Sequence, residues 1–316
     1  DEYDIDLICL LENLKFNSEY EIKNIVGKRL KEHSKYKSML QLEGKRCWTL
    51  EYDEFHMDIL PCVPKYNYYI EPLLTEVKLT HKLEDGNYFP KYSNPYKYHE
   101  WFEGRMKLQL NEAKNEYSIR NKVEISEIPL YKVKTPLQRA IQLLKRHRDI
   151  IYDRLPQSRK DNAPISIIIT TLAAYSYNNE LSVYETLNNI LINMEKYIEI
   201  RNGKYYIINP VLSDENFADK WNETPKKAEE FYYWIQTAKY DIIDEPISVL
   251  GLHNVSEKLE YCFGKNLVKR SFSKVADTMK EARENKTLYV NSLTEGLATI
   301  SNNNSKKVEG HTFFGK

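Results

Sequence analysis

Three aspartates near the start of the chain have the spacing of a metal-binding carboxylate cluster. Asp4 and Asp6 stand one residue apart in an apolar run over residues 3–11, and Asp58 lies in a second apolar run over residues 56–61. Because side chains alternate across a β-strand, Asp4 and Asp6 are expected to share one face. Carboxylates that converge from neighbouring strands repel one another unless a cation neutralises them. The chemistry that uses such a cluster is nucleotidyl or phosphoryl transfer with two Mg²⁺ ions, or with Mn²⁺ in their place. The alternative is a strand-end pair of aspartates that caps a turn and faces water.

The overall charge is balanced, with 46 lysines and arginines against 46 aspartates and glutamates, so net charge indicates no particular partner. Two segments are strongly basic. Residues 27–46 carry seven basic and two acidic residues, and residues 131–160 carry nine basic and two acidic residues. These two basic stretches either provide positive charge for a nucleoside triphosphate or form ordinary solvated helix faces. With only ten glycines and neither GxxxxGK[ST] nor GxGxxG, the sequence argues against P-loop and Rossmann nucleotide sites.

The cysteines and the hydropathy pattern indicate a cytoplasmic protein. Cys9, Cys47, Cys62 and Cys262 show no CxxC spacing, and no His/Cys spacing is typical of a zinc site. Such a pattern fits a reducing compartment. No stretch approaches 18 apolar residues and no signal peptide is recognisable, so we expect no membrane segment.

Three predicted strands and a helix must position the aspartates. Residues 3–11 are predicted to form a buried strand, followed by a helix capped by Asn17 or Ser18. Residues 46–52 and 55–60 are predicted to form a hairpin, which places Asp58 in the same sheet as the other two aspartates. The apolar stripe of the helix is formed by Ile22, Ile25, Val26 and Leu30.

Turn residues set the limits of this hairpin. Asp53-Glu54 is predicted to form its turn, and Pro61 and Pro64 are expected to end its second strand. Residues 65–98 are rich in turn residues and tyrosine, and a helix is predicted from Tyr98 to about Ala113.

A strong helix start marks the predicted domain boundary. Thr135-Pro136-Leu137-Gln138 combines a Thr N-cap, a Pro in the first turn and a Gln three residues after the cap. We therefore expect one domain over residues 1–134 and a second, mainly helical domain over residues 135–316. A hairpin with its turn at Asn202-Gly203 is predicted to interrupt the helical half. The helices predicted there span residues 137–152, 164–177, 181–198, 225–240, 254–263 and 270–284.

Taken together, these motifs resemble a known family. Six motifs occur in the order and spacing found in this family. They are the DxD strand, His56-Met57-Asp58-Ile59-Leu60-Pro61, Ser93-Asn94-Pro95, the Thr135 helix start with Lys145-Arg146-His147-Arg148-Asp149, Pro164-Ile165-Ser166 and Asn209-Pro210-Val211. The chain is similar over nearly its whole length to bacterial CD-NTases, the cyclic GMP-AMP synthase/DncV-like nucleotidyltransferases of CBASS anti-phage defence.

The resemblance implies an α+β fold, with a polymerase-β-like nucleotidyltransferase core, a mainly helical C-terminal domain and an active site in the cleft between them. It implies that Asp4, Asp6 and Asp58 are the catalytic, metal-binding triad. It assigns Lys145 to the triphosphate of the donor nucleotide, such as ATP, and Ser166 to a second contact with it. From the residues alone, Lys145 is also compatible with a solvated helix face and Ser166 with a plain helix cap.

The resemblance also concerns the two ends of the protein. The family has a long N-terminal helix and a Gly-Ser loop before the DxD strand, so we expect both in a longer form of this protein. Some members are joined through their C-terminus to other proteins by an E1-like partner, and Gly315 near the end permits this interpretation. The alternative is a tail whose phenylalanines pack on the helical domain.

The function predicted from the sequence is synthesis of a cyclic di- or trinucleotide second messenger from nucleoside triphosphates, in anti-phage signalling. One alternative is a linear oligonucleotide or RNA-end nucleotidyltransferase. The other is a catalytically silent module that binds nucleotide or RNA through the two basic stretches.

Overall fold

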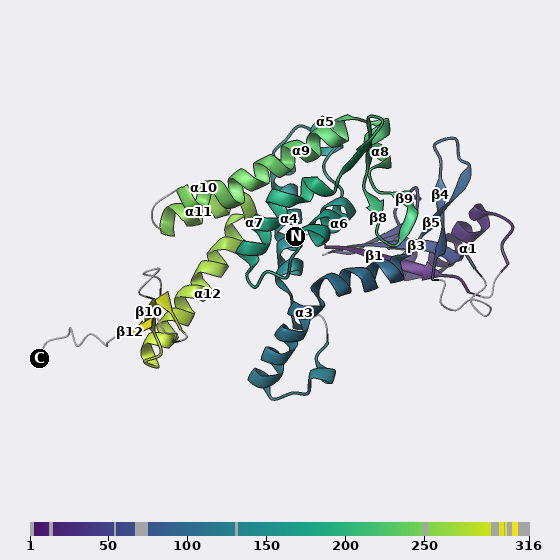
Figure 1. Cartoon of the computed structure of the whole chain (residues 1–316). Coiled ribbons are helices and arrows are strands. Elements are labelled where there is room, and N and C mark those ends of the chain that lie inside the picture. The colour runs from purple at the N-terminus through teal and green to yellow at the C-terminus, as the bar shows by residue number, and fades with distance from the viewer. Residues whose placement is uncertain are drawn as a thin grey trace, which may run out of the picture. The chain divides into compact units, whose positions relative to one another are not determined.

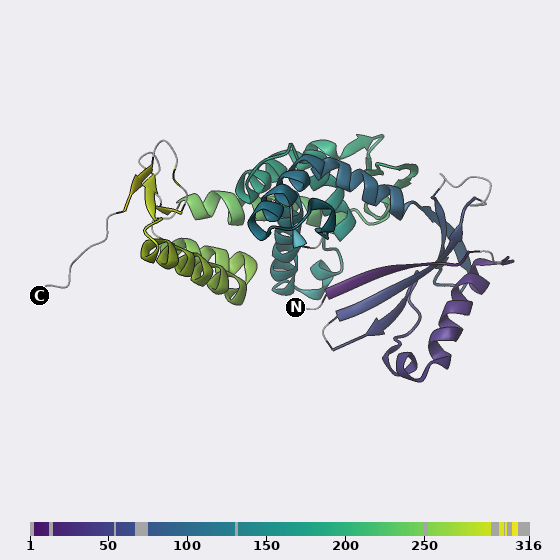
Figure 2. The same ribbon diagram turned by 90° about the horizontal axis from the view of Figure 1, so that it is seen from below.

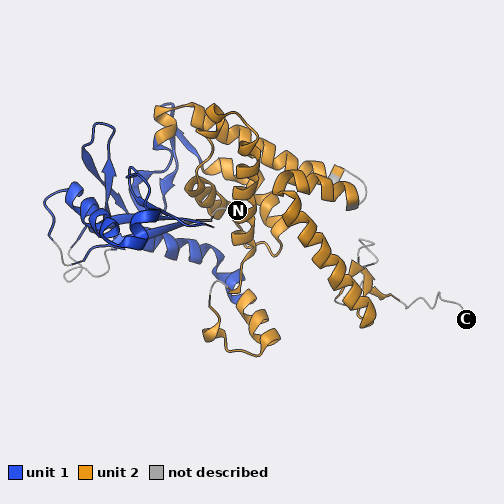
Figure 3. Cartoon of the chain, turned by 180° about the vertical axis from the view of Figure 1, so that it is seen from behind, with its two compact units in different colours: residues 1–111, 198–219 blue, residues 112–197, 220–316 orange. Residues whose placement is uncertain are grey.

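The computed structural model describes residues 3–12, 15–53, 55–66, 75–129, 132–248, 252–291, 297–299, 301 and 305–308 (Figure 1). The chain divides into two compact units, shown in blue and orange in Figure 3. Unit 1 comprises residues 1–111 and 198–219, and unit 2 comprises residues 112–197 and 220–316. The predicted functional division at residues 134/135 stays a prediction, because compactness alone does not define a functional domain.

Unit 1 is built on a mixed five-stranded sheet with helix α1 packed beneath it (Figure 2). Strand β3 is central, because it pairs in parallel with β1 on one side and antiparallel with β2 and then β4 on the other. The strands are β1 (Tyr3–Leu10), β2 (Trp48–Glu51), β3 (Phe55–Pro64), β4 (Val77–Lys82) and β5 (Tyr88–Ser93). The predicted strand, helix and hairpin of the N-terminal region are thus present, although Glu54 in the hairpin turn lies outside the described residues. The expectation that the first strand is buried is wrong, because Ile5, Leu7 and Leu10 are all exposed on this edge strand.

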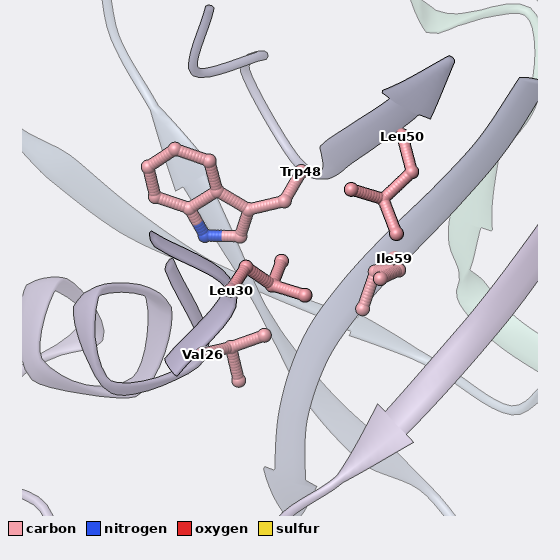
Figure 4. Close-up of a cluster of buried hydrophobic side chains, with 5 residues drawn as sticks. All are labelled: Val26, Leu30, Trp48, Leu50 and Ile59. Atoms are coloured by element: carbon pink, nitrogen blue, oxygen red, sulfur yellow. The ribbon is translucent and has the colours of Figure 1, made fainter. Parts of the chain in front are cut away.

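The hydrophobic core of unit 1 lies between α1 (Glu19–Glu32) and one face of the sheet. Figure 4 shows its buried cluster of Val26, Leu30, Trp48, Leu50 and Ile59. Ser18 caps the helix by accepting a hydrogen bond from the amide of Glu21, as the sequence indicates. The predicted apolar stripe is wrong at Ile25, which is 43% exposed and does not join this core.

Pro61 lies within strand β3, so the expectation that it ends the strand is wrong. The carbonyl of Cys62 accepts a hydrogen bond from the amide of Leu11, which follows β1, so the polar groups of Pro61 point to the opposite edge. On that edge β2 pairs only as far as Ile59 and β4 begins at Cys62. The missing N–H of Pro61 therefore falls in a gap between two partner strands and costs no ladder hydrogen bond.

The hairpin β4–β5 was not predicted, because its residues lie in a stretch rich in turn residues and tyrosine. It is closed by a turn in which Asp85 accepts a hydrogen bond from the amide of Asn87 and Gly86 has φ +87°. The following helix, α3 (Pro95–Asn121), extends beyond the predicted range at both ends. Unit 1 also contains α2 (Ser34–Met39) between α1 and β2.

A later segment of the chain returns to unit 1. It carries the predicted hairpin, whose turn residues Asn202 and Gly203 both have positive φ, as a tight two-residue turn requires. Ser93 donates to the Glu215 carboxylate at 3.3 Å, and Lys91 pairs with Asp219 at 3.3 Å. The strands of this segment are β6 (Glu199–Arg201), β7 (Lys204–Tyr206), β8 (Ile208–Asn209) and β9 (Leu212–Asn216).

Unit 2 is mainly helical, and α4 (Pro136–Asp153) packs against α6, α7, α9 and α11. The predicted start of α4 is confirmed by a complete capping box, in which Thr135 and Gln138 cap each other's backbone amides. The other long helices are α6 (Ser166–Ser176), α7 (Val183–Asn193), α9 (Lys226–Lys239), α11 (Leu252–Phe263) and α12 (Lys265–Glu284).

Short elements complete unit 2. These are η1 (Ile125–Glu127), α5 (Gln157–Lys160), η3 (Met194–Tyr197), α8 (Asp219–Glu223, which begins at the end of unit 1), the π-helix η4 (Tyr240–Asp244), α10 (Glu245–Ser248), β10 (Tyr289–Asn291), β11 (Leu297–Ala298) and β12 (Ser305–Lys307). The tail over residues 309–316, on which the E1-like partner was predicted to act, lies outside the described residues. Within the described part of the chain, no helix combines the length and hydropathy needed to cross a bilayer.

Candidate active site

Two of the three predicted metal ligands are direct neighbours across the sheet of unit 1. The parallel register of β1 and β3 pairs Asp6 with Asp58, and the antiparallel register of β2 and β3 pairs Thr49 with the same Asp58. Strands in a sheet lie about 4.8 Å apart, so the three residues form a row across three strands. The structure thus brings Asp6 and Asp58 together, as the sequence predicts.

This row lies on the face of the sheet opposite the hydrophobic core. Trp48, Leu50 and Ile59 alternate with Thr49 and Asp58 and are buried against α1 (Figure 4). Alternation therefore directs Thr49 and Asp58 to the other side of the sheet. We call this side the carboxylate face, defined by Asp6, Thr49 and Asp58. On it Asp6 is exposed and Asp58 is half-buried.

Asp4 lies in β1 two residues before Asp6 and is paired by register with His56. Strand alternation places its backbone on the same side of the sheet as Asp6, whereas its side chain lies outside the described part of the structure. The carboxylate triad predicted from the sequence stays a prediction for this residue.

Thr49 contacts the Asp58 carboxylate, a role that the sequence analysis missed. Its hydroxyl donates a hydrogen bond of 2.5 Å to Oδ1 of Asp58. The sulfur of Cys47 lies 3.7 Å from the same hydroxyl, and burial raises the pKa of this thiol above its ordinary value. The signal was present in the sequence, because a two-residue turn at Asp53-Glu54 sets residue 49 opposite residue 58.

The donors of the carboxylate face fit a hard divalent cation. Oxygen ligands from carboxylates are those that Mg²⁺ and Mn²⁺ prefer. Asp6 and Asp58 come from directly paired positions of adjacent strands, and both are open to solvent at least in part. Two adjacent negative charges without a bridging cation would repel each other, so the arrangement favours a bound metal.

A second candidate group lies in unit 2, where Lys145 and Ser166 were predicted to contact nucleotide. Lys145 is half-buried on α4, and Arg148 follows it by three residues, which places both on one side of the helix. Arg148 donates hydrogen bonds to the carbonyl of Pro164 at 2.9 Å and to the hydroxyl of Ser166 at 3.1 Å. Arg148 therefore links α4 to the start of α6, a contact that the sequence analysis did not predict.

The alternative view of Ser166 as a plain helix cap is wrong. Ile165 occupies the N-cap position of α6, and no side chain there accepts a hydrogen bond from the first backbone amides. Ser166 is instead the first helical residue, with an exposed hydroxyl. The first amides of this 11-residue helix suit an anion such as phosphate. The charge of the Arg148 guanidinium is balanced by its ion pair with Asp149 at 2.6 Å, so Arg148 orients the Ser166 hydroxyl and adds little net charge.

Much of the basic stretch over residues 131–160 is engaged inside unit 2. Arg146 donates to the carbonyl of Phe263 at 2.6 Å, and Arg154 stacks on Tyr261 at 4.0 Å. Arg159 forms two hydrogen bonds with Glu230, at 2.7 and 2.6 Å. These three arginines act in helix packing, so this stretch is not a continuous surface for a nucleic-acid backbone.

A buried cluster of His147, Asp241 and Cys262 in unit 2 also has metal-ligating side chains, within 4.8 Å of one another. Nε2 of His147 lies 3.1 Å from Oδ2 of Asp241, and Cys262 donates to the carbonyls of Asp241 and Lys258. Nδ1 of His147 has no partner among the described residues, so a cation on Nε2 would leave a buried N–H without an acceptor. Burial raises the pKa of Cys262 to about 12, which disfavours a thiolate ligand. The cluster is a packing contact of α4.

Comparison with known proteins identifies the class of this enzyme. No protein-family model matches the chain. The chain is 31% identical over 296 residues to the c-di-GMP synthase of Roseivirga ehrenbergii, covering 90% of this chain and 72% of that protein. Its fold is similar to that of the CD-NTase CdnG of Bradyrhizobium diazoefficiens, solved in complex with GTP, with a TM-score of 0.63, 19% identity and coverage of 87% and 80% of the two chains. It is also similar to Vibrio cholerae DncV, with a TM-score of 0.54, 15% identity and coverage of 83% and 62%.

The chain therefore belongs to the CD-NTase family. It has the α+β fold of these proteins, as the resemblance in its sequence implies, and it is a nucleotidyltransferase of the class that forms cyclic oligonucleotides.

Proposed function

We propose that this enzyme joins nucleoside triphosphates into a cyclic dinucleotide, with GTP as a substrate, and that Asp4, Asp6 and Asp58 are its catalytic carboxylates. The observation that carries the proposal is the register pairing of Asp6 with Asp58 on an open face of the sheet. The choice of GTP is supported by the similarity to a c-di-GMP synthase and to a CD-NTase solved with GTP.

The reaction needs an acceptor ribose hydroxyl to attack the α-phosphorus of a donor triphosphate. An oxygen–phosphorus bond forms, the bond to the leaving pyrophosphate breaks, and the hydroxyl proton must be removed. Two Mg²⁺ ions bound by the three carboxylates would supply charge stabilisation for the attacking and leaving oxygens. Asp58 is the residue proposed to assist removal of the proton, because it lies at the centre of the row on the carboxylate face. A second transfer then closes the ring.

In this proposal Lys145 and Ser166 bind the triphosphate of the donor. Support comes from the electropositive start of α6 and from Arg148, which holds the Ser166 hydroxyl beside it. Lysine provides a compact charge for a phosphate oxygen, and the hydroxyl provides a donor. Replacing Lys145 by alanine should raise KM for nucleotide more than it lowers kcat, whereas Lys134→Ala, just before α4, should leave both unchanged.

The cyclic product is proposed to act as a second messenger in anti-phage signalling, in the cytoplasm. The regulatory partner proposed for the tail, an E1-like protein, would act on residues beyond Val308. Mass spectrometry of the tail after incubation with such a partner would test this, and an unmodified tail would refute it.

The first experiment compares wild-type protein with Asp58→Asn in an incubation with labelled nucleoside triphosphates and Mg²⁺ or Mn²⁺. Products are treated with phosphatase and resolved by chromatography and mass. We expect a phosphatase-resistant cyclic species from the wild type and a loss of turnover of about 10³-fold or more in the variant. Asp85→Asn, in the β4–β5 turn of the same unit, is the matched control and should keep full activity.

Three outcomes would contradict the proposal. A folded Asp58→Asn protein with near-normal turnover would exclude the triad. Phosphatase-sensitive oligomers would assign the protein to the linear transferases. Salt-dependent RNA binding without any turnover would favour the silent binding module.

A further inference from the structure

We propose that Thr49 is a positioning residue for catalysis: its hydroxyl fixes the Asp58 carboxylate in the orientation needed on the carboxylate face. This inference rests on the proposed role of Asp58 and extends it to a residue of the neighbouring strand. In this proposal Thr49 contacts neither the metal ions nor the reacting atoms. It acts only through Asp58.

The contact is direct and uses one of the two carboxylate oxygens. Thr49 and Asp58 are register partners in the antiparallel pair β2–β3, and the hydroxyl donates to Oδ1 at 2.5 Å. Hydrogen bonds from a hydroxyl to an ionised carboxylate are short and stronger than neutral ones. Because the bond engages only Oδ1, it selects one rotation of the carboxylate group and sets the direction in which Oδ2 points.

The direction of the hydrogen bond follows from the chemistry of the two groups. An ionised carboxylate only accepts, so the hydroxyl proton of Thr49 must point to Asp58. The thiol of Cys47, 3.7 Å from the Thr49 oxygen, can then donate to that oxygen, and it also interacts directly with the Asp58 carboxylate. Thr49 provides the hydrogen bond to Oδ1, and the Cys47 thiol lies beside both groups.

The backbone around Thr49 is held in place by its neighbours. Its carbonyl accepts a hydrogen bond from the amide of Gln41 at 2.9 Å on the outer edge of β2. Its neighbours Trp48 and Leu50 are 4% and 2% exposed and lock the opposite face of the strand against α1 (Figure 4). A hydroxyl on a strand fixed in this way can orient a carboxylate without itself being reorganised.

The test replaces Thr49 by valine, which keeps the shape and β-propensity of threonine but removes the hydroxyl. Thr49→Ser, which keeps the hydroxyl, is the matched control. We expect Thr49→Val to lower kcat by about 10- to 100-fold while KM for nucleotide changes by less than about twofold. We expect Thr49→Ser to restore kcat to within about threefold of wild type, because the donor to Oδ1 is retained.

A second readout is independent of turnover. Binding of Mn²⁺ to the full-length protein with a non-hydrolysable GTP analogue is measured by electron paramagnetic resonance. Thr49→Val should weaken Mn²⁺ by about 10-fold, since residues that orient a metal ligand typically contribute this much, and Thr49→Ser should not. Thermal unfolding of both variants is measured as well. Thr49→Val is expected to unfold at a somewhat lower temperature but to be fully folded at the assay temperature, which separates positioning from a loss of structure.

The outcomes distinguish this inference from the proposed function. If Asp58→Asn is inactive but Thr49→Val matches the wild type, the positioning role is refuted and the triad stands. If Thr49→Val and Thr49→Ser are equally impaired, or if Mn²⁺ binding to Thr49→Val is unchanged, the hydroxyl is not the cause and the inference is refuted. If Asp58→Asn is active, the proposed function itself fails.

Discussion

Replacing Gly27 by alanine is expected to destabilise unit 1, although alanine is the better helix former. Gly27 lies inside α1 and is buried against the Trp48 indole. An added Cβ would lie 2.9 Å from Cη2 of Trp48 and closer still to Cζ2 and Cε2, so the ring must move. The ring is fixed by its burial and by the hydrogen bond of 3.0 Å from its Nε1 to the carbonyl of Lys23.

The size of the effect follows from three contributions. The helix propensity of alanine favours the variant by about 1 kcal/mol. Overpacking against a rigid neighbour costs about 1–3 kcal/mol, and loss of the indole hydrogen bond costs about 1 kcal/mol. The expected net loss is therefore about 1–3 kcal/mol in the free energy of local opening.

The assay is hydrogen exchange followed by mass spectrometry, which reports on α1 and β2 separately from unit 2. Peptides that cover these elements should exchange about 5- to 150-fold faster in Gly27→Ala, the factor that corresponds to 1–3 kcal/mol. Gly104→Ala is the matched control, because a Cβ at this exposed position of α3 would meet no atom within 4 Å. It should exchange no faster than wild type. Equal exchange in the two variants would refute the steric reasoning.

Two further predictions concern titratable groups. Hydrogen bonds from Arg159 chiefly hold the pKa of Glu230 below its ordinary value, so this carboxylate stabilises the fold at neutral pH and its contribution is lost as pH falls through that lowered pKa. Glu230→Gln should lower the free energy of unfolding by about 2 kcal/mol at pH 7, less than the loss of a fully buried pair, because Arg159 is partly exposed. The stability of this variant in urea should depend less on pH below about 5 than that of the wild type. An unchanged acid dependence would contradict this. Burial raises the pKa of Cys62 and Cys262 to about 12, so these thiols should react slowly with a thiol reagent at pH 8. In the folded protein the reagent should label at most Cys9 and Cys47 rapidly, and in guanidinium chloride it should label all four cysteines. Rapid labelling of Cys262 without denaturant would contradict its burial.

The sequence predicted the elements whose signals are local. The Thr135 capping box, the Ser18 cap and the Asn202-Gly203 turn each depend on residues within one turn of chain, and all are confirmed. The hairpin β2–β3 was predicted from its turn and its alternation, and Asp58 was correctly placed in the sheet with Asp6.

What the sequence did not predict depends on contacts between distant segments. Strand β4 was missed because Lys78 and Lys82 lie among its apolar residues, and these lysines are neutralised by Glu19 and Glu43 from elsewhere in unit 1. Pro61 was predicted to end its strand, because a proline inside a strand is tolerated only where no partner needs its N–H. The gap between β2 and β4 that provides this cannot be read from the local sequence. The link from Arg148 to Ser166 joins two helices and leaves no pattern in either segment.

The return of residues 198–219 to unit 1 has a consequence for synthesis of the protein in the cell. Unit 1 is interrupted by the 86 residues from Glu112 to Tyr197, so its first 111 residues leave the ribosome well before the segment that completes them. At about 5–20 residues per second, this interval lasts about 4–17 seconds. During it, Ser93 and Lys91 lack the Glu215 and Asp219 partners that they have in the finished fold. Nascent chains halted between residues 112 and 197 should therefore be more sensitive to proteases, and bind chaperones more, than chains released after residue 219.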